Sequence, residues 1–103
     1  MKIPESVRIA GTEYEVEYVD HLNDGVTLAY GHIDFENCKI ELAGTIGKSH
    51  QKRCKVLWHE ILHGIVEDNG MKLENEEEIV EMFSKGIYQV LQDNGQRFFD
   101  LKE

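Results

Sequence analysis

Five consecutive residues near the middle of the chain, His59-Glu60-Ile61-Leu62-His63, form an H-E-x-x-H sequence. Residues four apart lie one above the other on a helix, so the imidazoles of His59 and His63 can reach one metal ion. Glu60 is rotated by about 100° from His59 around a helix, which places its carboxylate at the open side of that ion. In zinc hydrolases with this pattern, the histidines bind Zn²⁺ and the glutamate is the general base. The motif therefore predicts a zinc site with Glu60 as its catalytic residue.

A catalytic zinc ion takes three protein ligands and keeps a fourth position for water, so one further ligand is needed. No histidine follows His63, which excludes the longer metzincin pattern. Glutamates cluster instead at the start of the next helical segment, at Glu76, Glu77, Glu78 and Glu81. The residue pattern thus implies a glutamate as third ligand and leaves open which one it is.

The segment that contains the motif has the pattern of a long helix. From Ser49 onward, apolar residues recur at spacings of three and four, as at positions 54, 57, 58, 61, 62 and 65. Ser49 is the expected N-cap of this helix, and Gly70 is the expected stop. A second helix is expected to begin near Asn75 and to continue to Leu91, before Asp93-Asn94-Gly95 breaks it.

The first 43 residues consist of shorter segments. Residues 7–10 and 13–19 predict a hairpin, because charged residues alternate with apolar or aromatic ones at period two. Residues 20–25, rich in Asn, Asp and Gly, predict a loop. Residues 28–35 and 38–42 predict a second hairpin that turns at Glu36-Asn37. About four short strands of this kind suffice for one small antiparallel sheet.

The order of these elements, a sheet first and two packed helices afterwards, predicts an α+β fold whose helices cover one face of the sheet. We expect one domain over residues 1–103, with a β-rich half at 1–43 and a helical half at 44–103 that contains the metal site. A chain of this length buries only about 65% of the surface of its unfolded state, so a bound metal would add to its stability.

The sequence Glu77-Glu78-Ile79-Val80-Glu81-Met82-Phe83 resembles the gluzincins, the zinc peptidases typified by thermolysin. In that family a glutamate on a following helix completes the zinc site, and an acidic residue four positions later orients a histidine. The resemblance implies that Glu77 is the third ligand and that Glu81 contacts a histidine.

Nearly the whole chain resembles the small zincin-like proteins that phages and prophages encode. In these proteins a short β-rich half precedes a helix with W-H-E-I-L-H and an acidic helix that runs into G-x-Y-Q-V-L-x-D-N, here residues 86–94. The resemblance implies a minimal zincin-like fold and a zinc metallopeptidase that acts on a peptide or protein.

Helical periodicity favours a different third ligand. The apolar residues of the second helix centre on a face that includes Glu76 and leaves Glu77 and Glu81 near the opposite side. We follow the family pattern for two reasons. A helix lying between the sheet and the motif helix would be buried on two faces. In addition, a charged side chain that binds a metal can lie inside the protein. Glu77 is the expected ligand, with Glu76 and Glu78 as alternatives.

Charge and hydropathy exclude several classes of partner. The chain has 11 Lys+Arg against 20 Asp+Glu, a net charge of −9, which argues against nucleic acid. Its basic cluster, Lys48, Lys52, Arg53 and Lys55, is expected to be mostly a solvated helix start. No apolar run approaches the roughly 18 residues of a membrane span, and the N-terminus lacks the apolar stretch of a signal peptide. A cytoplasmic protein is therefore expected, in a bacterial host cell if a phage encodes it.

Some residues with reactive or aromatic side chains are expected to be structural. Cys38 and Cys54 predict two buried or half-buried thiols. The aromatic side chains of Trp58 and Tyr88 are expected in the core. The remaining histidines, His21, His32 and His50, are also interpreted as structural, with His32 as the one spare ligand among them.

Two functions from different classes fit these residues. The first is a zinc-dependent peptidase in which a metal-activated water attacks a peptide bond and Glu60 takes its proton. The second is a metal-stabilised phage regulatory or binding protein without peptidase activity, which the small size of the chain favours. Glu60 favours the first, because a closed structural site has no use for a base. An accidental motif on a metal-free fold is a third reading, and the sequence indicates neither a substrate nor an oligomeric state.

Overall fold

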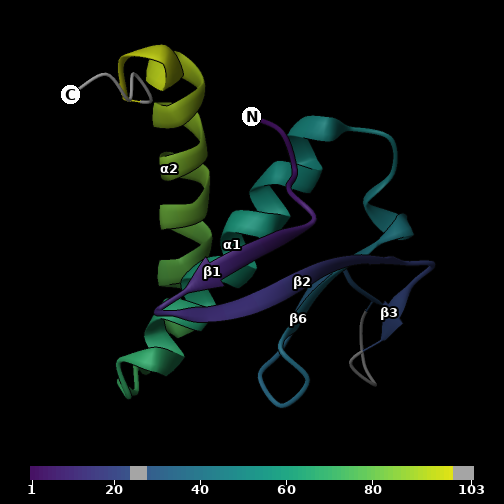
Figure 1. Ribbon diagram of the computed structural model, residues 1–103, viewed down its shortest axis with the longest axis vertical. Helices are drawn as coiled ribbons and strands as arrows, with labels where there is room; N and C mark the ends of the chain where they lie inside the picture. The colour runs from purple at the N-terminus through teal and green to yellow at the C-terminus, as the bar shows by residue number, and fades with distance from the viewer. Residues whose placement is uncertain (24–27, 99–103) are drawn as a thin grey trace.

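The computed structural model describes residues 1–23 and 28–98. Within these residues, short strands precede two long helices, as Figure 1 shows. The elements are β1 (Ser6–Ile9), β2 (Thr12–Val19), β3 (Leu22–Asn23), β4 (Leu28–Ala29), β5 (Gly31–Asp34), β6 (Lys39–Ala43), a 3₁₀ turn η1 (Gly44–Ile46), α1 (His50–Asp68) and α2 (Glu76–Phe98). The α+β fold predicted from the sequence is confirmed.

The main sheet has four strands in the order β1-β2-β6-β5. The pairings of β1 with β2 and of β5 with β6 are antiparallel, whereas β2 and β6 are parallel. The expectation of a wholly antiparallel sheet was therefore wrong in one pairing. The alternation of residues predicts strands and hairpins, but it does not determine which hairpin strands become neighbours in the sheet.

Both predicted hairpins are present, but the strand predicted at residues 28–35 is divided, because residues 28–29 form β4, which pairs with β3, and only β5 pairs with β6. The first turns at Ala10 and Gly11, whose φ angles of 49° and 84° are the positive values that a two-residue hairpin turn requires. The second turns after Asp34, whose carboxylate accepts hydrogen bonds from the backbone and side-chain nitrogens of Asn37, at 3.0 and 2.9 Å.

The predicted loop at residues 20–25 is only partly correct. Its residues 22 and 23 form strand β3, which pairs with β4 in a small ribbon of its own, apart from the main sheet. Its residues 24 and 25 lie outside the described residues.

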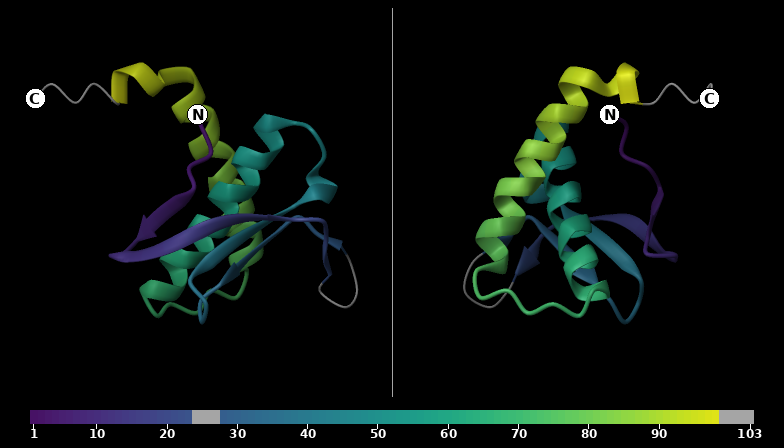
Figure 2. Two further views of the ribbon diagram at one scale, coloured as in Figure 1. Left: turned by 45° about the vertical axis from the view of Figure 1, so that its right-hand side comes forward. Right: turned by 90° about the vertical axis from the view of Figure 1, so that its left-hand side faces the viewer.

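The molecule has three layers, and Figure 2 shows them in the order sheet, α1, α2. α1 contacts strands β1, β5 and β6, while α2 packs mainly on α1. Its buried residues Val80, Ser84 and Tyr88, spaced by four, form one stripe along the helix. The prediction that α2 lies between the sheet and the motif helix was wrong, because the motif helix is itself the middle layer.

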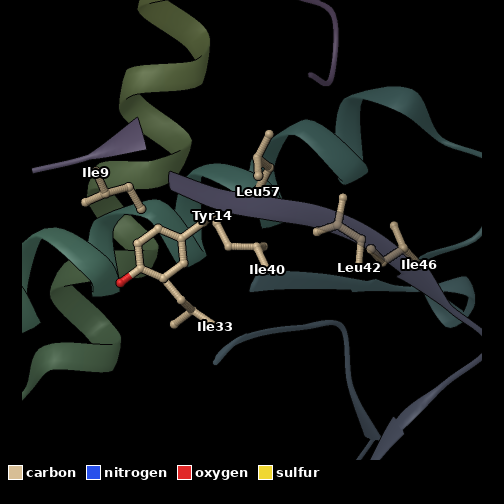
Figure 3. Close-up of a cluster of buried hydrophobic side chains, with 7 residues drawn as sticks. All are labelled: Ile9, Tyr14, Ile33, Ile40, Leu42, Ile46 and Leu57. Carbon is tan, nitrogen blue, oxygen red and sulfur yellow. The ribbon is translucent and has the colours of Figure 1, made fainter. Parts of the chain in front are cut away.

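The core lies between the sheet and α1 (Figure 3). Ile40, Leu42 and Leu57 have no exposed surface, and they anchor a cluster that also includes Ile9, Tyr14, Ile33 and Ile46. Gly64 allows α1 to lie close to the sheet, since a Cβ there would be 2.9 Å from Ile9 Cδ1. The motif helix is thus fixed by apolar packing along its sheet-facing side.

The ends of α1 agree with the sequence analysis, but the end of α2 does not. The Ser49 side chain accepts a hydrogen bond from the Lys52 backbone nitrogen, and Gly70 adopts a φ of 65° just beyond the helix. α2 continues through residues 93–95 to Phe98 instead of breaking there. Its Asn94 side chain donates to the Val90 carbonyl inside the helix. Over the described residues, neither helix is long and apolar enough to cross a membrane.

Candidate metal centre

α1 presents His59 and His63 one turn apart on the side that faces α2. Their rings pack edge to face with centroids 4.8 Å apart, and their Nε2 atoms are 3.1 Å apart. The two side chains are mostly buried, with 13% and 17% of their surface exposed. The i, i+4 spacing in a continuous helix thus brings the same nitrogen of both imidazoles to one point.

The beginning of α2 brings Glu77 to that point. One of its carboxylate oxygens, Oε1, is 2.7 Å from His59 Nε2, and the other, Oε2, is 2.9 Å from His63 Nε2. The Glu77 side chain is 72% exposed, so the cluster is open to solvent on its side. Among residues 1–23 and 28–98, His59, His63 and Glu77 form the one group of this kind able to hold a metal ion, with ligand atoms within 4.8 Å of one another.

Two further carboxylates contact the outer nitrogens of the imidazoles. Glu81 Oε2 is 2.9 Å from His59 Nδ1, and Glu76 Oε2 is 2.6 Å from His63 Nδ1. A carboxylate at Nδ1 favours the tautomer that has its hydrogen there, which leaves the Nε2 lone pair free for a metal. The structure therefore gives each histidine a carboxylate partner of its own.

Glu81 lies where the family resemblance placed it, whereas the contact of Glu76 was missed. Glu76 had been considered only as an alternative to Glu77 as the ligand. The available signal was the helical periodicity, which put Glu76 on the inward face of the second helix. The remaining alternative, Glu78, is exposed and lies outside the group that could hold a metal.

The Glu81 carboxylate is held in its ionised form. Partial burial raises its pKa, but a hydrogen bond from Lys85 and the neighbouring His59 outweigh this, so the pKa falls below its ordinary value of 4.5. The Lys85 nitrogen is 3.1 Å from Glu81 Oε1, the oxygen that does not contact His59. An ionised Glu81 can accept the Nδ1 hydrogen of His59 at neutral pH.

The spacing of the inner ligand atoms is compatible with zinc. Ligand atoms about 2.0–2.1 Å from a tetrahedral ion lie about 3.3 Å from one another. Here the two Nε2 atoms are 3.1 Å apart, and each lies 2.7 or 2.9 Å from a different oxygen of the Glu77 carboxylate. If both Nδ1 atoms have their hydrogens, the Nε2 lone pairs and the Glu77 carboxylate face one another without a hydrogen between them. A cation at their centre would relieve this repulsion, and two imidazoles with one carboxylate leave it an open position.

No protein-family model, no curated protein and no solved structure matches this chain. The resemblance to gluzincins and to small phage zincins therefore stays a prediction. The argument for a metal centre depends on the distances among the side chains of α1 and α2 described above.

Glu60 lies on the side of α1 that faces strand β5. Its side chain is buried, with only 7% of the residue exposed. Burial raises the pKa of its carboxyl above the ordinary value of 4.5, and the neighbouring His59 and His63 only partly oppose this. A carboxylate with a raised pKa beside a metal site has the properties of a general base.

Gly31, at the start of β5, makes room for the Glu60 side chain. A Cβ built on Gly31 would lie 3.1 Å from Glu60 Oε2 and 2.6 Å from Val56 Cγ1. A larger residue at this position would therefore force the Val56 side chain to move and would press against the Glu60 carboxylate. The sequence analysis did not single out Gly31, although a glycine within a strand pattern often indicates a close approach of this kind.

The residues interpreted as structural lie away from the three inner atoms. His32 pairs with Glu41 at 3.4 Å, and the pair joins two neighbouring strands. Tyr88 is buried against α1, with the Lys55 nitrogen 5.9 Å from its ring centroid. The Trp58 indole nitrogen is 3.1 Å from the Met1 sulfur, and its ring is only partly buried. The two free thiols are half-buried at Cys38 and buried at Cys54, as predicted.

Proposed function

We propose that this protein is a zinc-dependent peptidase. The observation that supports the proposal most strongly is the convergence of His59 Nε2, His63 Nε2 and the Glu77 carboxylate, with Glu60 buried beside them. His59, His63 and Glu77 would hold the ion, and Glu81 and Glu76 would orient the two imidazoles. Bound zinc would supply a Lewis acid that polarises the scissile carbonyl and lowers the pKa of water at the open position to about 7.

Glu60 is the residue to which the proposal assigns the proton transfers. Its carboxylate accepts a proton from the attacking water as the water oxygen bonds to the carbonyl carbon, and returns that proton to the departing amine when the C–N bond breaks. The raised pKa of Glu60 suits both steps, because a carboxyl that is too acidic cannot hold the proton between them. Gly31 keeps the space in which this carboxylate lies.

Strand β5 offers a surface for aligning a peptide. It is the last strand of the main sheet, with β6 as its one partner in that sheet over the described residues. An edge strand has free backbone donors and acceptors, to which an extended peptide can add as a further strand. Because Gly31 of β5 lies against Glu60, a peptide paired with this edge would pass close to the proposed base.

A Glu60→Gln variant tests the proposal most sharply. The amide has nearly the same shape but cannot accept the proton, so zinc content and thermal stability should stay close to wild type while cleavage falls by at least about 100-fold. Cleavage of a mixture of peptides of diverse sequence is followed by mass spectrometry. Glu67→Gln is the matched control, because Glu67 is an exposed glutamate of the same helix. Equal cleavage by wild type and Glu60→Gln would contradict the proposal.

One observation favours a second function, that of a metal-stabilised binding protein. The group that could hold a metal links the start of α2 to the middle of α1, so an ion there would also hold the two helices together. In that case no peptide in the mixture would be cleaved by zinc-loaded wild type, and Glu60→Gln would leave partner binding intact.

A further inference from the structure

A cavity of about 370 Å³, with both polar and apolar groups in its wall, adjoins the candidate metal centre. Its wall includes Tyr30 from the turn before β5, Lys52 and Lys55 from the first half of α1, and Glu81 and Lys85 from α2. The sequence analysis assigned the basic residues of α1 to a solvated helix start. The structure instead brings two of them together with Lys85 from the other helix, which sequence spacing alone does not indicate.

The cavity is positively charged in a chain of net charge −9. Lys85 is paired with Glu81 at 3.1 Å. Among residues 1–23 and 28–98, neither Lys52 nor Lys55 has a carboxylate within 4.0 Å, and the Lys55 nitrogen lies over the Tyr88 ring. The exposed phenol of Tyr30 adds a hydroxyl that can donate. Three ammonium groups and one carboxylate leave an excess of positive charge in this wall.

Glu81 connects the cavity to the metal centre. Its Oε2 contacts His59 Nδ1 at 2.9 Å, and its Oε1 contacts the Lys85 nitrogen at 3.1 Å. A residue of the cavity wall thus contacts a proposed zinc ligand directly. A group bound among the lysines would lie within a few residues of a peptide bond held at the metal centre.

We propose that this cavity binds a carboxylate of the substrate, so that the enzyme prefers peptides with an acidic group close to the scissile bond. The proposal rests on the proposed peptidase function and names its substrate class. Lysine ammonium groups bind a carboxylate as charged donors, and the volume is in the range of small-ligand sites. A peptide carboxylate is favoured over the backbone of a nucleic acid, because the acidic surface of the chain as a whole would repel a long polyanion.

The test uses short peptide hydroxamates, which bind zinc in such sites without being cleaved. In matched pairs, a glutamate or a glutamine residue lies one or two residues from the hydroxamate, on either side, with both ends of the peptide blocked. A third set has glutamine and a free C-terminal carboxylate. Binding to the zinc-loaded full chain is measured by calorimetry. We expect the glutamate compound of at least one pair to bind about tenfold more tightly than its glutamine partner.

The lysine variants identify where that preference arises. Lys52→Gln/Lys55→Gln should lose most of the preference, whereas Lys48→Gln, an exposed lysine outside the cavity wall, should keep it. Lys85 is left unchanged, because its loss would also disturb Glu81. Thermal unfolding of each variant shows whether it is folded. A preference only for the free C-terminal compound would assign the site to a terminal carboxylate instead of an acidic side chain.

Equal binding of all compounds by wild type, or a preference that survives in Lys52→Gln/Lys55→Gln, would overturn this inference. So would an absence of hydroxamate binding, or failure of the double variant to fold while Lys55→Gln alone folds and keeps the full preference. Absence of hydroxamate binding would count against the metal centre as well. The other outcomes leave the peptidase proposal untouched, because that proposal is tested separately by comparing peptide cleavage by wild type and by Glu60→Gln.

Discussion

The two sides of α1 are held in place by different forces. The side that faces the sheet is mostly apolar, with Leu57 fully buried in the main cluster and Gly64 against Ile9, and Glu60 is its one buried charged residue. The side that faces the start of α2 has two imidazoles surrounded by the carboxylates of Glu76, Glu77 and Glu81. Burial of apolar surface stabilises the first side whatever ions are present, whereas the second depends on charge.

The second side gathers acidic groups at one place. The carboxylates of Glu76, Glu77 and Glu81 all lie within 3 Å of an imidazole nitrogen of His59 or His63. A divalent cation bound among them would offset part of their mutual repulsion. The comparison therefore predicts that a metal ion matters to the junction of α1 and α2 and hardly at all to the junction of α1 and the sheet.

Removal of the metal should cause the largest change, a loss of protection from hydrogen exchange that is confined to the start of α2. After chelation, backbone amides in the first turns of α2 should exchange with solvent about tenfold faster or more, while those of β6 around Ile40 and Leu42 stay protected. Hydrogen exchange read by mass spectrometry distinguishes the two regions. His63→Ala in the presence of zinc is the control and should match the chelated wild type. Equal loss of protection in the sheet and α2 would contradict the comparison.

Replacement of Glu77 should cause the next largest change, a loss of affinity for zinc. Glu77→Ala removes an inner ligand atom, so the affinity for zinc should fall by more than about 100-fold. Glu78→Ala is the matched control, because it removes a neighbouring exposed glutamate that lies outside the group. Competition with a chromophoric chelator gives both affinities. A larger loss in Glu78→Ala than in Glu77→Ala would remove Glu77 from the ligand set.

The carboxylates of Glu81 and Glu76, which contact the Nδ1 atoms, should contribute less to zinc affinity than Glu77. Glu81→Ala and Glu76→Ala each remove a partner of an Nδ1 atom, and losses of zinc affinity of about 10- to 100-fold are typical of such partners. The same competition assay measures them. If Glu76→Ala matched or exceeded Glu77→Ala, Glu76 would be the ligand, as helical periodicity alone suggests.

Short-range patterns in the sequence predicted much of the arrangement around the motif. The H-E-x-x-H spacing needs only a helix, and apolar periodicity with Ser49 as N-cap predicted that helix correctly. The proximity of Glu77 and Glu81 to the histidines was expected from the family resemblance, and the structure brings these side chains together. Their roles toward a metal stay predictions.

Long-range features were the ones that the sequence did not reveal. The order of the layers decides which face of α2 is inward, and with α1 in the middle both Glu76 and Glu77 can reach His63. Helical periodicity favoured Glu76 and the family pattern favoured Glu77, and the structure brings both residues into contact with His63. The parallel pairing of β2 with β6 and the approach of Gly31 to Glu60 also depend on how distant segments meet.

The zinc content of the purified protein tests the metal centre most directly. Elemental analysis after expression in zinc-replete medium should give about one zinc per chain for wild type and for Glu60→Gln, and almost none for His63→Ala. Wild-type protein without zinc under these conditions, or His63→Ala with as much zinc as wild type, would contradict the assignment of His59, His63 and Glu77 as its ligands.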